Sequence, residues 1–385
     1  MLNQGTKRGL LRRLKRVEWI YALYYKLSLL QELRKAKREM LRYEVKSKQQ
    51  IEIELNLIRK YWNCTYTDFY LFYGLYKKHL NTEELLDYVP PFYFLNFHQE
   101  VKHKEIDTIR YKNKLTQYHL FKELGITTSE LVGKFENGLL VNREGESISI
   151  SNLVELYLKD IDSKLFFKPA MGQGGAGIKV LKRVGANLSF GDDLLNHDQV
   201  ITALNSSITY VIEDGIKQRE DLNAINSSCV NTLRVIAQNI ESEMYLSVCI
   251  LRMGRSNSDV DNSAQGGLSI QVDIQTGRFS EYAIAEHGGG MFYQHPDSGF
   301  EFKNKKIEDW NSIRLAILRN AQHLAMFRDI ALDVAITKTG IEIIEFNFGY
   351  GIDHLQSTCG GMRRRLHLNV PNDLPDSTNN NIQLR

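Results

Sequence analysis

The sequence predicts an α+β protein in which a helical N-terminal region precedes a sheet-rich body. Helical composition extends from Leu10 through the aromatic stretch 66–76 to the Pro90-Pro91 pair, which breaks it. From about residue 160 to 350, β-branched and aromatic runs alternate with glycine turns, as is typical of strands. We expect these strands at 163–168, 178–183, 210–213, 233–238, 244–252 and 268–273.

Composition narrows the class of protein. The 385 residues suffice for two or three packed units. They nowhere include about eighteen uninterrupted apolar residues, so no transmembrane helix is expected. The start lacks the features of a signal peptide, which favours a cytoplasmic location. No CxxC motif occurs, so we expect small buried side chains rather than disulfides or zinc ligands at Cys64, Cys229, Cys249 and Cys359.

Positive charge is concentrated at the N-terminus. The net charge is +3, but residues 1–50 hold 14 Lys and Arg against 4 Glu, a balance of +10 that leaves −7 for the rest. A nucleic-acid-binding surface over the fold is therefore not expected. The apolar residues of this segment follow the spacing of one helix face, with arginines and a lysine between them, at Leu10, Leu14, Val17, Tyr21 and Tyr24. Such a helix either binds anionic lipid or packs on the chain with a solvated basic side.

A glycine-rich run lies between two expected strands. Gly172, Gly174 and Gly177 satisfy GxGxxG, but a dinucleotide-binding fold needs a helix after the glycines and a Walker loop needs Lys-Ser/Thr. Because a strand follows here, we expect a hairpin flap whose backbone N–H groups close over phosphates, with Lys168 supplying positive charge from below. The chain has no HRD or DFG motif of a protein kinase. A glycine-rich turn without a ligand is the alternative.

Two carboxylates are expected to face each other on a later hairpin. If residues 338–340 form a three-residue loop with Gly340 left-handed, Asp333 pairs with Glu345, and Asn347 shares their face. Facing carboxylates about 4.5–5.5 Å apart repel unless a cation lies between them. Two carboxylates and an amide oxygen suit Mg²⁺ that also binds substrate phosphates. A solvated hairpin with charges on its wet face is the alternative.

A third motif ends the expected strand at 210–213. Glu213 and Asp214 are followed by Gly215 and Ile216, and Glu220 comes shortly afterwards. Such a strand end suits a hinge whose backbone hydrogen-bonds a purine while an acidic side chain binds ribose hydroxyls. A strand end with solvated acids is the alternative.

In this chain order, flap, hinge and acidic hairpin resemble the ATP-grasp superfamily. More narrowly, the sequence is similar to the sugar-transfer-associated ATP-grasp family, linked to surface-polysaccharide biosynthesis. The similar segments are 230–235, 251–255, 261–262, 266–267, 295–297, 332–334 and 345–347. The resemblance covers about residues 106–360 and implies an ATP-grasp fold, two α+β subdomains clasping ATP. The run 348–350 departs from the small, proline-bearing run of many ATP-grasp ligases.

The resemblance also implies roles for individual residues. Lys168 would bind the phosphates and purine of ATP, Glu213 with the Gly215–Ile216 backbone would hold adenine, and Glu220 would bind ribose. The flap would consist of Gly172, Gly174, Gly175 and Gly177. One or two Mg²⁺ ions would bind Asp333, Glu345 and Asn347.

Three further basic residues are implied in catalysis or phosphate binding. Lys114, which opens an expected helix at 109–124, resembles an upstream phosphate lysine of the superfamily, with a solvated helix lysine as the alternative. Arg234 and Arg252 lie on expected strands. They would stabilise the γ-phosphate and the acyl phosphate, with structural ion pairs as the alternative.

The activity implied is ATP-dependent ligation of a carboxylate, here a uronic acid of a glycan precursor, to an amine such as an amino acid, through an acyl phosphate. A sugar kinase and a non-enzymatic ATP-binding scaffold for glycosyltransferases are the alternatives. We expect a basic helical region at 1–105, a segment and small subdomain at 106–216, a large subdomain at 217–370 and a disordered tail at 371–385. The basic start predicts peripheral attachment to the inner face of a membrane.

Overall fold

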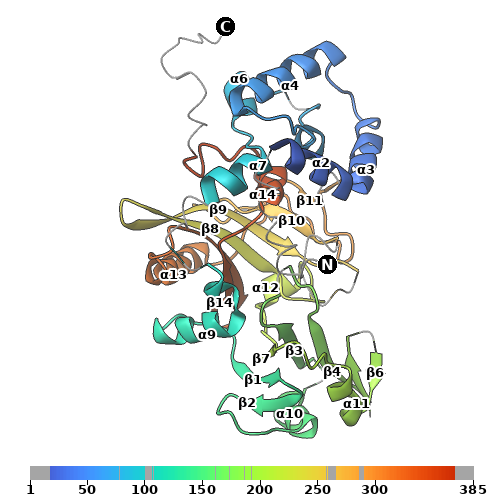
Figure 1. Cartoon of the computed structure of the whole chain (residues 1–385), viewed down its shortest axis with the longest axis vertical. Coiled ribbons are helices and arrows are strands. Elements are labelled where there is room, and N and C mark those ends of the chain that lie inside the picture. Colours follow the sequence, from blue (N-terminus) through green and yellow to red (C-terminus); the bar gives the residue numbers. More distant parts are fainter. Residues whose placement is uncertain are drawn as a thin grey trace, which may run out of the picture.

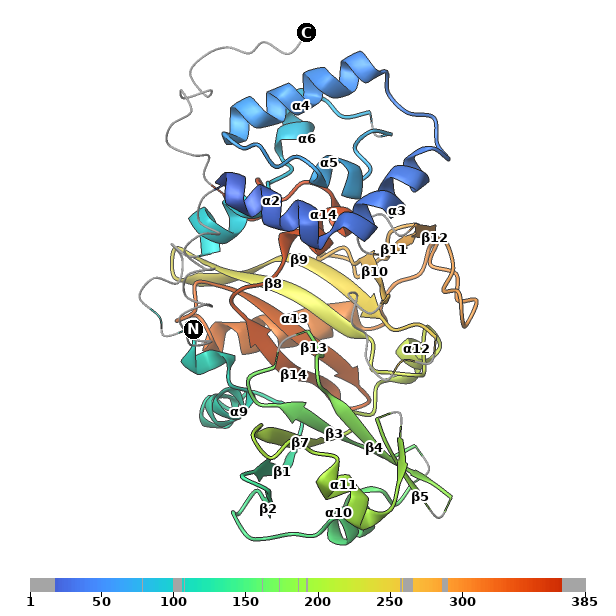
Figure 2. The ribbon, with the colours of Figure 1, turned by 45° about the vertical axis from the view of Figure 1, so that its right-hand side comes forward.

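The computed structural model describes residues 18–368, except 78, 100–105, 107, 161, 173, 186, 192, 257, 259–265 and 286–289. The first part of the expected basic helix, residues 10–17, and the expected tail at 371–385 lie outside the described residues. A helical region, a large sheet and a small sheet follow one another along the long axis of the molecule (Figures 1 and 2). The fold is therefore α+β with a helical N-terminus, as the sequence predicts.

Helices with well-defined ends fill the N-terminal region. Ser47 accepts a hydrogen bond from the Gln50 N–H at the start of α4, and Asn63 ends this helix with φ 45°. Asn81 and Glu84 form a capping box on α6. The bounds are α2 Glu18–Ser28, α3 Leu30–Met40, α4 Lys48–Trp62, α5 Phe69–Phe72, α6 Thr82–Leu86, α7 Pro91–Tyr93 and a π-helix Phe94–Gln99.

The small sheet has seven strands in the order β2-β1-β7-β3-β4-β5-β6, and every neighbouring pair is antiparallel. Its apolar face packs against α10 (Ile150–Tyr157) and α11 (His197–Thr202) around Phe135, Phe167 and Phe190. The strands are β1 Leu131–Glu136, β2 Leu139–Asn142, β3 Lys164–Pro169, β4 Lys179–Val184, β5 Asn187–Phe190, β6 Asp193–Leu195 and β7 Tyr210–Asp214. α12 (Glu220–Asn223) follows β7.

The large sheet is also antiparallel, in the order β12-β11-β10-β9-β8-β13-β14. One face packs against α13 (Trp310–His323) and α9 (Lys114–Glu123). The other face packs against the N-terminal helices and α14 (Ile352–Cys359). The strands are β8 Thr232–Ile240, β9 Glu243–Met253, β10 Leu268–Gln271, β11 Ala283–Ala285, β12 Met291–Phe292, β13 Asp329–Thr337 and β14 Gly340–Asn347.

The β13–β14 hairpin has the predicted pairing of Asp333 with Glu345, but its turn differs from the predicted one. Thr337 pairs with Gly340, so the turn has two residues, and the predicted three-residue loop is wrong. Gly340 has φ 142°, which is not the left-handed helical value predicted. A bulge after Asp333 then adds one residue to β14, so Asp333 does pair with Glu345. The facing carboxylates are therefore confirmed, although the turn that was to produce them is not.

The six expected strands correspond to β3, β4, β7, β8, β9 and β10, with ends within about two residues. The expected helix 109–124 is divided: a 3₁₀ turn at Arg110–Lys112 precedes α9, which begins at Lys114 because Asn113 caps it. Gly125 follows with φ 67°, as expected of a residue that closes a helix. α9 contacts both sheets: Phe121 lies in the core of the large sheet, whereas Leu115 and Tyr118 pack against Leu131, Ala170 and Val211 of the small sheet.

Two expectations from composition concern the whole chain. All four cysteines are buried and form no disulfide, which confirms them as core side chains. Among the helices that the structure describes, none combines the length and apolar character needed to cross a membrane.

Candidate active site

A row of charged side chains crosses the large sheet on the face that α14 and the N-terminal helices partly cover. Arg234 on β8 pairs with Asp333 on β13, which pairs with Glu345 on β14, so the three side chains lie side by side. Arg252 on β9 extends the row, because it is directly opposite Thr232, two residues before Arg234. The alternation of side chains along strands places all of them on one face.

Asp333 is the centre of this row. Its side chain is only 4% exposed, and its Oδ2 accepts from the Arg234 guanidinium at 2.9 Å and lies 3.1 Å from that of Arg252. Burial raises the pKa of Asp333, but the charges of the two arginines outweigh burial, so its pKa lies below the ordinary value. Both arginines therefore make ion pairs with Asp333, and their role in phosphate chemistry stays a prediction. Such a role is compatible with these ion pairs, because both arginines remain partly exposed.

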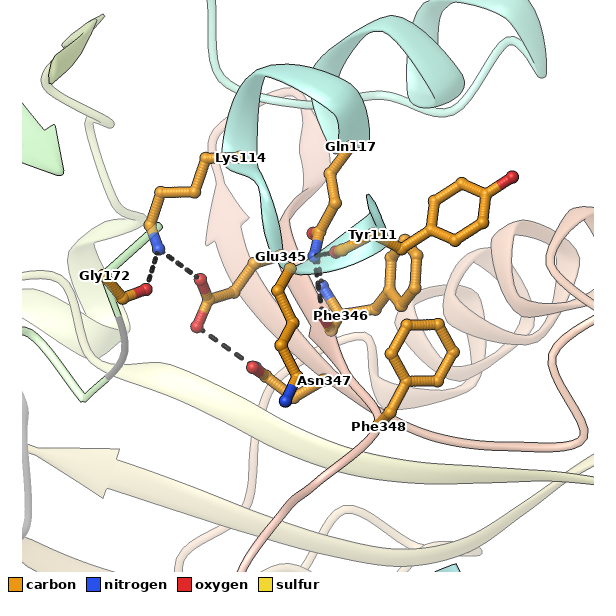
Figure 3. Close-up of a pocket in the computed structure, with 9 residues that line it drawn as sticks. Tyr111, Lys114, Gln117, Gly172, Glu345, Phe346, Asn347 and Phe348 are labelled. Atoms are coloured by element: carbon orange, nitrogen blue, oxygen red, sulfur yellow. Dashed lines mark hydrogen bonds and ion pairs between the residues drawn. The ribbon is translucent and has the colours of Figure 1, made fainter. Parts of the chain in front are cut away.

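Glu345 has a separate cation. Lys114 Nζ lies 3.4 Å from Glu345 Oε2, and Asn347 Nδ2 donates to Glu345 Oε1 at 3.1 Å. Lys114 Nζ also donates to the carbonyl of Gly172 at 2.7 Å (Figure 3). Lys114 therefore joins the acidic hairpin of the large sheet to the glycine loop of the small one. An ordinary solvated helix lysine would be more exposed than its 15%.

The expected repulsion between facing carboxylates is offset by protein cations, because Arg234 and Arg252 contact Asp333 and Lys114 contacts Glu345. Repulsion alone therefore does not require a metal. Within the described residues, no three His, Cys, Asp or Glu side chains are arranged to hold one. The oxygens of Glu345, which is 24% exposed, and of Asn347 do fit a hard cation, whereas both Asp333 oxygens already bind arginine.

Glu345 and Asn347 line a pocket at the junction of the two sheets. Gln117 supports its wall: its amide donates to the Phe346 carbonyl at 2.9 Å and accepts from the Phe346 N–H at 3.0 Å. It thereby satisfies the outer edge of β14, the last strand of the sheet. The pocket is lined by Tyr111, Lys112, Lys114, Gln117, Gly172, Glu345, Phe346, Asn347 and Phe348 (Figure 3). Gln117 was not predicted; a polar residue among apolar ones on a helix face was its only signal.

On the small sheet, Lys168 and Glu213 form a second ion pair. Their Nζ and Oε2 atoms are 2.6 Å apart, and the Ser129 hydroxyl donates to the same oxygen at 2.8 Å. The two side chains are 14% and 12% exposed, and they project from the adjacent antiparallel strands β3 and β7. The structure thus brings together two of the residues predicted to contact ATP.

The glycines occupy a loop between two antiparallel strands, β3 and β4, so the expected hairpin is confirmed. Gly174, Gly175 and Gly177 have φ of 62°, 72° and 75°, a conformation that L side chains rarely adopt. No helix begins at Gly177, which separates this loop from dinucleotide-binding motifs.

Two predicted contacts at the hinge are placed differently. The Gly215 N–H donates to the Lys164 carbonyl at 2.9 Å, which continues the pairing of β7 with β3, so this N–H is not available to a purine in this structure. The Gly215 carbonyl and the Ile216 backbone are the remaining hinge groups of the prediction. The Glu220 carboxylate is 72% exposed and pairs with Lys338 at 3.2 Å, at the turn of the acidic hairpin.

The row of the large sheet continues into residues that the sequence did not indicate. Arg252 donates to the Thr232 hydroxyl at 2.7 and 3.0 Å, and Ser269 on β10 lies directly opposite Arg252. The Ser269 hydroxyl is hydrogen-bonded to Nε2 of His354, on α14. Because His354 is 85 positions from Ser269, spacing along the chain gives no signal of this contact.

Two α+β layers joined at a glycine hairpin and an acidic hairpin define the ATP-grasp fold. The chain belongs to the sugar-transfer associated ATP-grasp family, whose model matches residues 97–367. No curated protein matches the chain. The predicted resemblance is confirmed, and the matched region begins only after most of the N-terminal helices.

Solved structures show distant likeness. D-alanyl-alanine synthetase A from Vibrio cholerae is 13% identical with a TM-score of 0.37, covering 67% of this chain and 60% of that one. D-alanine-D-alanine ligase from Helicobacter pylori is 15% identical with a TM-score of 0.36, covering 67% and 57%. Carboxyaminoimidazole ribonucleotide synthase from Aspergillus clavatus, complexed with ATP, is 13% identical with a TM-score of 0.37, covering 68% and 53%. The chain therefore spans less than two thirds of these relatives.

Proposed function

We propose that the protein is an ATP-dependent carboxylate–amine ligase that acts through an acyl phosphate. The observation that carries this proposal is the Arg252–Arg234–Asp333–Glu345 row beside a lysine-bridged glycine hairpin. It combines cations that can stabilise a transferred phosphoryl group with oxygens that can hold Mg²⁺, next to a loop rich in backbone N–H groups. Family membership and the ligases among the solved structures support the same class.

ATP would lie between the two sheets. Lys168 and Glu213 are the polar groups for its nucleoside end, and the loop 172–177 would close over its phosphates. Lys114 would exchange its contact with the Gly172 carbonyl for a phosphate oxygen, because a doubly charged phosphate attracts an ammonium group more strongly than a carbonyl does. This exchange would free the loop to move as nucleotide enters.

Glu345 and Asn347 would hold Mg²⁺, with Asp333 as a further oxygen if one arginine moves to phosphate. When bound, Mg²⁺ supplies charge that neutralises the β- and γ-phosphate oxygens. Arg234 and Arg252 would also neutralise phosphate oxygens, since Asp333 already holds both guanidinium groups at one point of the sheet. The carboxylate thus acts as a positioning group for the arginines.

The chemistry has two balanced steps. A substrate carboxylate oxygen attacks the γ-phosphorus, and the bond to the β-phosphate oxygen breaks to release ADP. The neutral amine then attacks the acyl carbon, the bond to phosphate breaks, and the nitrogen loses one proton to form the amide. A carboxylate is a poor electrophile at neutral pH, so the first step supplies the leaving group. A closed glycine loop would exclude the water that otherwise hydrolyses the acyl phosphate.

The substrate carboxylate would bind towards the Arg252, Ser269 and His354 end of the row, since the opposite end is occupied by the metal oxygens. Family naming supports a sugar acid, such as a uronic acid, as this substrate and an amino acid as the amine. Exposed Gly349 and Gly351, beside which an added Cβ would meet no atom within 4 Å, leave room for a substrate ring near the start of α14.

The experiment is ADP release by the full chain with Mg²⁺ and a panel of uronic acids, each with and without amino acids. We expect ADP release that needs both substrates, and a hydroxamate when hydroxylamine replaces the amine. Glu345→Gln should abolish both signals, whereas Glu342→Gln, a matched change on the same strand, should not. ADP release with neutral sugars and no amine would instead identify a sugar kinase. ATP binding without ADP release on any of them would identify a scaffold.

A further inference from the structure

A stripe of apolar and basic side chains runs along the outer side of α2 and α3. Leu23, Leu27 and Leu30 are 53%, 61% and 39% exposed. Continuing at three- and four-residue intervals, Arg34 and Arg38 are exposed, and Leu41 is 86% exposed. At this spacing Leu23 and Leu27 share one face of α2, and Leu30, Arg34 and Arg38 share one face of α3, with Leu41 at the end of α3. We call these six residues the outer stripe.

The opposite side of the same helices explains why the outer stripe faces outwards. Leu33 and Ala36 are 5% and 1% exposed in the N-terminal core, and Leu29 packs against them. Leu33 and Ala36 fix the rotation of α3, and Ala22, which packs against the same core, does so for α2. The leucines of the outer stripe therefore cannot turn inwards without exposing these residues. Figure 2 shows α2 and α3 one after the other along one side of the helical region.

The charge of the outer stripe indicates what covers it. No salt bridge within the described part of the chain involves Arg34 or Arg38, whereas Arg42, which lies off the stripe, pairs with Glu39. Positive charge from residues 1–50, with a balance of +10, adds to theirs. Exposed leucines can insert among lipid chains, and arginines without a salt bridge can pair with anionic headgroups. The outer stripe therefore matches the interface of an anionic lipid layer.

We propose that the outer stripe docks the protein on an anionic membrane, with the helices lying in the plane of the headgroups. Each of the two 11-residue helices is roughly 16 Å long at 1.5 Å per residue, long enough to give several simultaneous contacts. A second copy of the chain is a poorer match, because its outer stripe carries the same positive charge and offers the arginines no anionic partner. The proposal does not depend on the proposed chemistry.

The test is co-sedimentation of the full chain with phosphatidylcholine vesicles, with and without phosphatidylglycerol. We expect binding to the anionic vesicles that weakens with salt, and at least a tenfold loss of affinity in the triple variant L23S/L27S/L30S. The matched control is L139S/L156S/L194S, which changes three leucines that are 63%, 55% and 64% exposed on the small-sheet half. This control should bind like the wild type.

A charge variant separates attraction from insertion. R34E/R38E should also lose binding at least tenfold, whereas K159E/R183E, at exposed positions of the small-sheet half, should lose little. Equal loss in both charge variants would assign binding to net charge and overturn the proposal, as would no binding of the wild type to anionic vesicles. A dimer by light scattering that L23S/L27S/L30S dissociates, with unchanged vesicle binding, would assign the surface to a second copy and would also overturn it.

Discussion

Asp333→Asn should destabilise the protein far more than its single lost charge suggests. Asp333 is 4% exposed and contacts both Arg234, at 18%, and Arg252, at 14%. Removing the carboxylate charge leaves two poorly hydrated guanidinium groups without the negative charge that balances them. Breaking a buried ion pair by removing one partner costs about 3–5 kcal/mol, because the remaining charge stays buried. Since native domains have only about 5–15 kcal/mol, this is a large fraction.

Urea unfolding at neutral pH measures the effect. Glu345→Gln on the neighbouring strand is the matched control, because Glu345 is 24% exposed and its partner Lys114 keeps a bond to Gly172. We expect its free energy of unfolding to fall by less than about 1 kcal/mol. An Asp333→Asn variant within about 1 kcal/mol of the wild type would show that Asp333 does not hold the arginines.

The dependence of the free energy of unfolding on pH, below neutral pH, gives an independent check of the role of Asp333. The pKa of Asp333 is lowered in the folded protein, so the unfolded chain binds its proton first as pH falls. The stabilisation is therefore complete above the unfolded value of about 3.9 and is lost at lower pH. Between pH 7 and acid, the wild type should lose stability more steeply than Asp333→Asn. Parallel pH profiles of unfolding would contradict this linkage.

Three further predictions concern ATP. Glu345→Gln should fold normally but lower ATP turnover by at least about a hundredfold, the scale for losing preorganised charge stabilisation, and turnover within a few-fold would refute a metal role. Lys168→Met should weaken ATP binding at least about tenfold in calorimetry, because it removes the cation beside Glu213, whereas Lys182→Met should not. Hydrogen exchange across residues 172–177 should slow when ATP is added, and unchanged exchange would show that the loop does not close.

The pattern of strands shows where sequence was sufficient. The six strands with continuous apolar or β-branched runs between about 160 and 350 were predicted. β1 and β2 were missed because they lie before the region in which strands were expected. β5, β6, β11 and β12 were missed because two to four residues give little periodicity. The same limit applies to turns. Asp333 was paired correctly with Glu345, yet the bulge that fixes this register depends on how β13 and β14 twist against their neighbours, which spacing does not encode.

The site was predictable where its residues lie on one hairpin and unpredictable where distant segments meet. Lys168, Asp333 and Glu345 follow from local motifs. The Ser269–His354 contact joins residues 85 positions apart, and the Lys114–Gly172 contact joins residues 58 apart. Glu220 fits a motif by spacing, but its carboxylate lies with Lys338 because α12 brings it to the hairpin turn.

The N-terminal helices share their core with strands made much later, which has a consequence for synthesis. Ile236, Ile250 and Ala331 of the large sheet are 0% exposed beneath these helices, and the Tyr73 hydroxyl donates to Asp353, 280 positions further on. At roughly 5–20 residues per second, a ribosome needs about 15 to 60 s to make that stretch. During this interval the aromatic segment 66–76 has no sheet to pack on. These helices are therefore made well before the strands that complete their packing, and translation speed should affect the yield of native protein.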